Sequence, residues 1–126
     1  MSARPKARTS APYFIVSDLQ RAIDFYARLG FVEPAVWGEP PCFGMMNRDG
    51  LDIMLSLTEG DAVPRPNGHG QWDMYLTVDD LDAEIAALKA ANVTIDRGPR
   101  TTEYRMNEIE VVDPDGFRIC IAQNVE

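Results

Sequence analysis

Two glutamates, Glu108 and Glu110, stand two positions apart in a stretch that is otherwise mostly apolar. Alternate residues of a strand point to the same face of a sheet, so we expect both carboxylates on one face. Asp73 follows Trp72 directly, and Tyr75 comes two positions later. Rings stack and attract cations while a carboxylate fixes a charge, so this combination suits flat or cationic ligands. The pattern indicates a small-molecule site. Two alternatives remain open: that the glutamates simply face water, and that the aromatic residues pack in the core or in a dimer interface.

Other reactive residue types are sparse. Ser17 and Ser56 have no histidine placed by a motif, so a Ser-His-Asp arrangement has no support. The only histidine, His69, is flanked by glycines and is expected to be exposed to solvent rather than to bind a metal. Cys42 and Cys120 lack the paired spacing of a zinc site and are expected to be buried, reduced thiols. No catalytic residue follows from these residues.

Length and charge restrict the class of protein. A chain of 126 residues fits one domain, and its net charge of −8 with a pI near 4.5 argues against a nucleic-acid partner. No apolar run approaches the roughly 20 residues that span a bilayer. The basic stretch at the N-terminus lacks the apolar core of a secretory signal, so residues 1–10 are expected to be a disordered tail and the protein to be cytoplasmic.

An internal repeat organises the rest of the chain. Segments 13–32 and 75–94 align at an offset of 62 residues, which places Tyr13 on Tyr75 and Asp18 on Asp80. Each copy begins with a β-prone run, continues with an aspartate suited to capping a helix, and then shows apolar residues at helical spacing. The repeat predicts a strand, a helix and a further strand in each half.

Turn signals complete the expected elements. An Asp-Gly pair at 49–50 and another at 115–116 predict hairpins. Proline, glycine and polar residues over 58–71 predict a connecting loop, and 96–106 predicts a second loop. The expected helices are 18–29 and 80–91, and the expected strands are 12–16, 31–37, 42–48, 51–57, 71–78, 93–96, 107–113 and 116–122. The fold class is therefore α+β, with one domain over 11–126 made of two βαβββ modules, 11–57 and 71–122.

Three phrases of the sequence resemble a known superfamily. They are VSDLQRAIDFYARLGF, VDDLDAEIAALKAANV and VVDPDGFRICIA, in this order. The chain resembles the glyoxalase, bleomycin-resistance and extradiol-dioxygenase superfamily, also called the vicinal-oxygen-chelate superfamily. This resemblance implies that each module curls its mixed sheet into a half-cup, with the helix on the convex face.

The metal-binding members of that superfamily place His, Glu or Gln at four positions. Transferred to this chain, the positions fall on Ala11, Met54, Asp73 and Cys120. Alanine has no atom that can bind a metal, and a thioether suits soft metals rather than hard divalent ions. The remaining two residues, Asp73 and Cys120, make at most half a metal site. We therefore expect neither a bound metal nor another cofactor.

The resemblance is nearest to the metal-free, bleomycin-resistance-like members. It implies a protein that binds or sequesters a small molecule, aromatic or cationic, in grooves of a homodimer. The alternative is a lyase or dioxygenase-type enzyme of the same fold, with an atypical metal site or a carboxylate base. Trp72, Asp73 and Tyr104 are expected near the opening of the groove. The complete set of predicted ligand-binding residues is Tyr13, Trp37, Phe43, Met54, Trp72, Asp73, Tyr75, Tyr104, Met106, Glu108 and Cys120.

Overall fold

The computed structural model describes residues 3–125 and contains two four-stranded sheets and two helices. In chain order the elements are β1 (Tyr13–Val16), α1 (Leu19–Arg28), β2 (Val32–Trp37), β3 (Phe43–Arg48), β4 (Leu51–Leu57), β5 (Met74–Thr77), α2 (Leu81–Ala90), β6 (Arg97–Thr101), β7 (Met106–Val112) and β8 (Arg118–Asn124).

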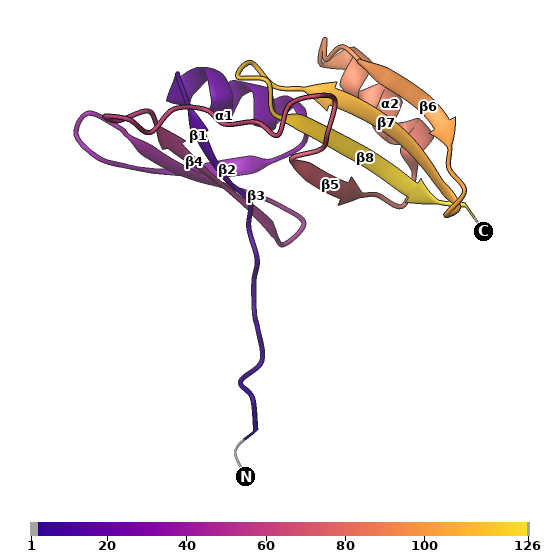
Figure 1. Cartoon of the computed structure of the whole chain (residues 1–126), viewed down its shortest axis with the longest axis horizontal. Coiled ribbons are helices and arrows are strands. Elements are labelled where there is room, and N and C mark those ends of the chain that lie inside the picture. The colour runs from indigo at the N-terminus through magenta and orange to yellow at the C-terminus, as the bar shows by residue number, and fades with distance from the viewer. Residues whose placement is uncertain (1–2, 126) are drawn as a thin grey trace.

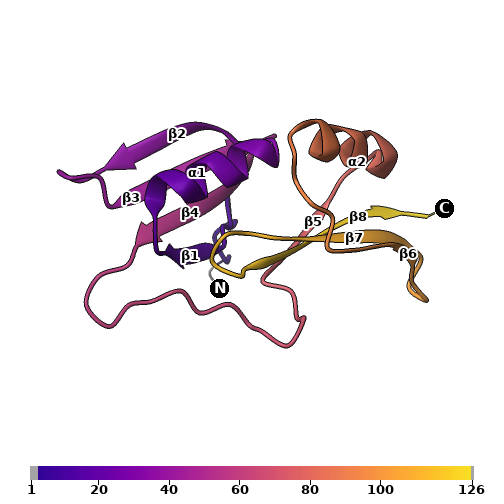
Figure 2. The same cartoon turned by 90° about the horizontal axis from the view of Figure 1, so that it is seen from above.

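The two sheets have the same topology. The strand order is β1-β4-β3-β2 in the N-terminal sheet and β5-β8-β7-β6 in the C-terminal sheet. In each module the first strand pairs in parallel with the last, and the other neighbours are antiparallel. Figures 1 and 2 show the two modules side by side, each with one helix against its sheet. The predicted α+β fold with two βαβββ modules is confirmed.

The helix caps repeat as the sequence predicts. The carboxylate of Asp18 accepts a hydrogen bond from the backbone N–H of Arg21 at 3.0 Å, and that of Asp80 accepts one from Ala83 at 3.0 Å. Each cap satisfies an N–H group that the first helical turn leaves without a partner. The helices begin at Leu19 and Leu81, which preserves the offset of 62 residues.

A shared core joins the modules. Phe14 of β1 stacks on Phe117, which precedes β8, with ring centroids 4.4 Å apart. The hydroxyl of Tyr26 on α1 donates a hydrogen bond to the buried carboxylate of Asp113 at 2.7 Å. Because both contacts connect the first module to the turn between β7 and β8, the two halves pack as one unit.

One predicted strand is misplaced. Residues 93–96 are not a strand, and β6 lies instead inside the segment predicted as a loop. Gly98 and Pro99 suggested that loop, but they fall where the register between β6 and β7 shifts. A proline is compatible with this position because β6 is an edge strand.

One burial prediction is also wrong, that of Cys42. Leu51, on the helix side of β4, is likewise 49% exposed, because it directly follows the hairpin turn at the end of the sheet. Cys42 is exposed because it lies in the turn before β3, whereas Cys120 is buried as expected.

The N-terminal arm, defined as residues 3–12, contains no helix or strand. Residues 3–10 are exposed, and Figure 1 shows the arm leaving the body below the N-terminal sheet, on the side opposite to α1. Its last residue, Pro12, accepts a hydrogen bond from the backbone N–H of Met54 at 3.0 Å. Among residues 3–125, no helix has the length and apolar character needed to span a membrane.

Candidate ligand-binding site

Each sheet has one face under its helix and one face without a helix, which we call the open face. On the N-terminal sheet the buried residues of β3 and β4 alternate with half-buried ones, and the latter define the open face. The strand register puts neighbouring side chains on it, for example Tyr13 beside Met54 and Trp37 beside Phe43. The N-terminal open face consists of Tyr13, Ile15, Trp37, Phe43, Met45, Asn47, Asp52, Met54 and Ser56.

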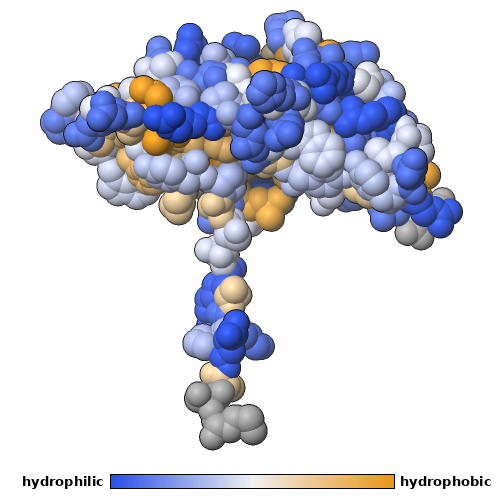
Figure 3. Space-filling model, in the orientation of Figure 1, coloured by the Kyte–Doolittle hydropathy of each residue, from blue (hydrophilic) through white to orange (hydrophobic). Residues whose placement is uncertain are grey.

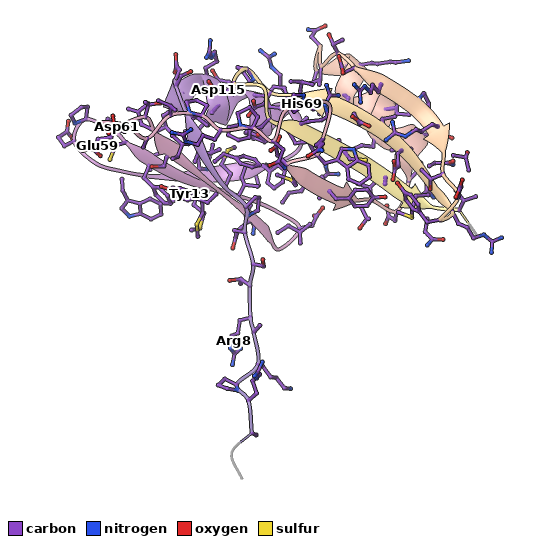
Figure 4. The ribbon with its side chains drawn as sticks, viewed as in Figure 1. Arg8, Tyr13, Glu59, Asp61, His69 and Asp115 are labelled. Carbon is purple, nitrogen blue, oxygen red and sulfur yellow. The ribbon has the colours of Figure 1, made fainter. Side chains whose placement is uncertain are left out.

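Large apolar side chains of this face are exposed. Tyr13 is 57% exposed and Trp37 is 51% exposed. The Trp37 ring lies against Phe43, with centroids 5.5 Å apart. In Figure 3 hydrophobic residues flank the place where the N-terminal arm leaves the body, and in Figure 4 Tyr13 lies on that same side. The N-terminal open face is thus mainly aromatic and apolar, and its carboxylate, that of Asp52, accepts a hydrogen bond from the side-chain amide of Asn47 at 2.8 Å.

The C-terminal open face is built differently, around a buried carboxylate. By the strand register it carries Tyr75, Met106, Glu108, Glu110, Arg118, Cys120 and Ala122. Glu108 is fully buried, and its Oε2 accepts hydrogen bonds from the hydroxyls of Tyr75 and Tyr104, both at 2.7 Å. Its Oε1 accepts one from Nη2 of Arg100 at 2.8 Å. Three donors therefore satisfy this carboxylate.

Glu110 extends the network along the same strand. Its Oε2 accepts a hydrogen bond from Nη2 of Arg100 at 2.6 Å, and its Oε1 accepts one from Nη1 of Arg118 at 3.0 Å. Arg118 also binds Asp96 at 2.7 Å. Burial acts to raise the pKa of Glu110, but hydrogen bonds, first that of Arg100, outweigh burial and lower the pKa below its ordinary value. Glu110 is therefore held ionised and compensated by the guanidinium groups of Arg100 and Arg118, with that of Arg97 farther away at 3.7 Å.

The phenols on this face remain protonated. The pKa of Tyr75 is raised by burial and by its hydrogen bond to Glu108. The pKa of Tyr104 is raised mainly by the hydrogen bond that Tyr104 itself donates to Glu108. The rings of Trp72 and Tyr75 lie 4.9 Å apart between centroids, so an aromatic pair adjoins the ion pairs. Both tyrosines donate their one hydroxyl hydrogen to Glu108, so toward a ligand they can accept a hydrogen bond, and they are not bases at neutral pH.

Cys120 lies beneath this network. It is fully buried, and burial together with the charges of Glu108 and Glu110 raises its thiol pKa to about 12. A thiol with such a pKa is neither a nucleophile nor a ready metal ligand at neutral pH.

Asp73 holds the connecting loop in place. One oxygen accepts a hydrogen bond from the backbone N–H of Asn67 at 2.7 Å, and the other accepts one from the backbone N–H of Arg118 at 2.8 Å. The Asn67 side chain in turn donates to the carbonyl of Trp72 at 2.6 Å. Both oxygens of the Asp73 carboxylate thus accept hydrogen bonds from backbone N–H groups. By holding Asn67, which binds the carbonyl of Trp72, Asp73 helps to position Trp72.

The four positions that bind metal in the superfamily do not fit a divalent ion in this chain. Ala11 offers no donor atom and Met54 offers a thioether, while Asp73 is engaged by backbone and Cys120 is a protonated, buried thiol. Within the part of the chain that the structure describes, no three His, Cys, Asp or Glu side chains are grouped to hold a metal. His69 is exposed on the connecting loop, and Figure 4 shows it on the opposite side of the strands from Tyr13.

The structure brings most of the predicted site residues to the two open faces. Tyr13, Trp37, Phe43 and Met54 lie on the N-terminal face, and the other predicted residues lie on or beside the C-terminal face. Sequence reasoning missed Arg100, because Gly98 and Pro99 of its strand are typical of a loop. The alternation of charge between β6 and β7, where Arg97 pairs with Glu110 and Arg100 with Glu108, was the available signal.

Fold and site together define a two-module α+β protein with one aromatic open face and one ion-paired open face. The chain belongs to the Glyoxalase/Bleomycin resistance protein/Dioxygenase superfamily, whose family model matches residues 10–121.

Solved structures of similar fold include an antibiotic-binding protein. TnmS3, an antibiotic binding protein from Streptomyces sp. CB03234, is 28% identical, with a TM-score of 0.70 over 98% of this chain and 99% of that chain. TioX from Micromonospora sp. ML1 is 20% identical, with a TM-score of 0.71 over 94% and 100% of the two chains. A glyoxalase-related enzyme from Clostridium phytofermentans is 12% identical, with a TM-score of 0.77 over 96% and 98%. The last two likenesses concern the fold alone.

Proposed function

We propose that this protein binds and sequesters a flat aromatic small molecule without a metal, in a groove formed by two copies of the chain. The observation that carries the proposal is the exposed aromatic surface around Tyr13 and Trp37. Such a surface is unusual on a monomer and marks a ligand or partner site. The similarity to TnmS3, an antibiotic binding protein, supports a binding role.

An aromatic ligand is favoured over a simple cation because the carboxylates are already compensated. Arg100 bridges Glu108 and Glu110, and Arg118 binds Glu110 as well. A cationic ligand would have to displace a guanidinium from a buried partner, which leaves a charge unpaired. The phenols of Tyr75 and Tyr104 add polar groups beside the aromatic pair, as in sites where a few polar groups orient a mostly apolar ligand.

A second copy is needed because one chain does not enclose a ligand at the N-terminal open face. In Figure 1 the C-terminal module lies beside the N-terminal open face and does not cover it. The hollow at the edge of this face, lined by Tyr13, Ile15, Val63, Arg65 and Phe117, has a volume of about 100 Å³. Pockets for drug-sized ligands measure roughly 300–1,000 Å³. A two-fold dimer that sets the aromatic face of one chain against the ion-paired face of its partner would supply the rest.

The ligand class can be tested by tryptophan fluorescence. Both tryptophans, Trp37 and Trp72, belong to the proposed site, so quenching by a bound aromatic compound reports directly on it. Titration with planar aromatic compounds should quench fluorescence at saturable concentrations, and aliphatic amines of similar size should not. Trp37→Ala should weaken binding about tenfold or more, as expected for an aromatic anchor. Leu51→Ala, an exposed apolar residue on the other face, is the control.

Metal analysis separates this proposal from a metalloenzyme of the same fold. The purified protein should contain no divalent metal in stoichiometric amount and should bind its aromatic ligand equally well after chelation. One metal ion per chain, or loss of binding on chelation, would overturn the metal-free proposal. The lack of suitable donor atoms at Ala11, Met54, Asp73 and Cys120 is the reason for the expected result.

A further inference from the structure

The N-terminal arm makes few contacts with its own body. Within residues 3–125, the hydrogen bonds of the fold begin at Pro12, and residues 3–10 are exposed. Figures 1 and 4 show the arm standing clear of the body, with Arg8 on it, on the side of the N-terminal open face. An extended backbone without internal partners is free to contact another molecule.

The charge of the arm is opposite to that of the remaining chain. Arg4, Lys6 and Arg8 are three of the 12 basic residues, and none of the 20 acidic residues precedes Asp18. The rest of the chain therefore carries 9 basic residues, 12 less 3, against all 20 acidic residues. A segment with a charge of +3 thus projects from a body with a charge of −11, which is 9 less 20. Opposite charges favour contact of the arm with an acidic surface such as a second copy of this body.

We propose that the N-terminal arm docks on the body of the partner copy and strengthens the dimer. The inference rests on the proposed dimer, because a partner that covers the N-terminal open face meets the arm, which leaves the body next to Tyr13. Ten extended residues reach up to about 33 Å, enough to cross a strand of the partner. Pro5 and Pro12 restrict the free arm and reduce the entropy lost when it docks.

The charge of the arm provides the first test. A variant with Lys6→Ser and Arg8→Ser is compared with a control, Arg28→Ser and Lys89→Ser, which removes the same charge from the last turns of α1 and α2. Sedimentation equilibrium at low and at high salt measures the dimer dissociation constant. The arm variant should dimerise about tenfold more weakly at low salt and lose most of the salt dependence, while the control stays close to the wild type.

Limited digestion with trypsin provides the second test. Cleavage after Lys6 and after Arg8 should slow as the wild-type concentration rises through the dimer dissociation constant. Cleavage at a constant rate would overturn the proposal, whether the arm is always free or always docked on its own body. Equal dimer dissociation constants for the wild type and both variants would also overturn the proposed role of the arm, while the proposal of a dimer would stand. A wild type that is monomeric at all concentrations would overturn both proposals.

Discussion

Glu108 is the side chain around which the C-terminal open face is arranged. A buried carboxylate is costly unless donors compensate it, and here two phenols and a guanidinium do so. Because these donors come from β5, from β6 and from the turn before β7, the carboxylate connects three parts of the module. We interpret it as an anchor that fixes Tyr75 and Tyr104 for a ligand.

Substitution of Glu108 by glutamine tests this interpretation. The amide nitrogen of Glu108→Gln would face a donor, either Arg100 or the two tyrosine hydroxyls, so one interaction becomes donor against donor. We expect the free energy of unfolding to fall by about 1–3 kcal/mol, the typical effect of losing a buried hydrogen bond to a charged group. Urea denaturation followed by circular dichroism measures the change. Glu103→Gln, at an exposed position of the β6–β7 turn, should have no effect.

The lowered pKa of Glu110 predicts how the free energy of unfolding changes at acidic pH. In the folded chain this pKa lies below the ordinary value of 4.5, so folding favours the ionised form. The stabilisation is present above that ordinary pKa and is lost as the pH falls through the lowered folded pKa. Glu110→Gln should therefore reduce the free energy of unfolding most at neutral pH and least in acid. Urea denaturation of both proteins at several pH values checks the trend, and a difference that grows in acid would contradict it.

At the scale of the element, the sequence allowed the helices and hairpins to be predicted because their signals are local. Asp18 and Asp80 mark the helix starts, and the Asp-Gly turns mark two hairpins. β6 was missed because Gly98 and Pro99 are typical of a loop, whereas in the structure they fall at the register shift between β6 and its hairpin partner β7. The burial of Glu108 could not be predicted from local signals, because one of its compensating donors, Tyr75, lies 33 residues away on β5.

The equivalence of the two caps can be measured. Asp18→Ala and Asp80→Ala should each reduce the free energy of unfolding by about 1 kcal/mol, since each removes an acceptor for an N–H of the first helical turn. Asp18→Asn and Asp80→Asn should retain most of the stability because the amide oxygen accepts the same bond. Asp24→Ala, inside α1, is the control. Thermal unfolding that leaves one Asp→Ala variant unchanged would contradict the equivalence of the modules.

At the scale of the whole molecule, the two open faces differ in a way that suits association. The N-terminal open face is aromatic and exposed, while the C-terminal open face presents phenols and guanidinium groups over buried carboxylates. Packing within the chain uses other surfaces, such as the stack of Phe14 on Phe117. In the proposed dimer a ligand and a second copy would contact the same open faces, so the two binding events would be coupled.

This coupling predicts that one substitution affects both events. Tyr13→Asp places a charge on the N-terminal open face, where a ligand and a partner would both exclude water from it, and an unpaired charge is costly there. We expect this variant to be monomeric by sedimentation and to lose the ligand response in fluorescence, while circular dichroism shows an intact fold. Leu51→Asp, equally exposed on the other face, should remain dimeric and bind. Since a ligand that binds only the dimer stabilises it by mass action, the wild-type dimer should tighten as ligand is added. A Tyr13→Asp protein that still dimerises and binds would place both the groove and the interface on another surface.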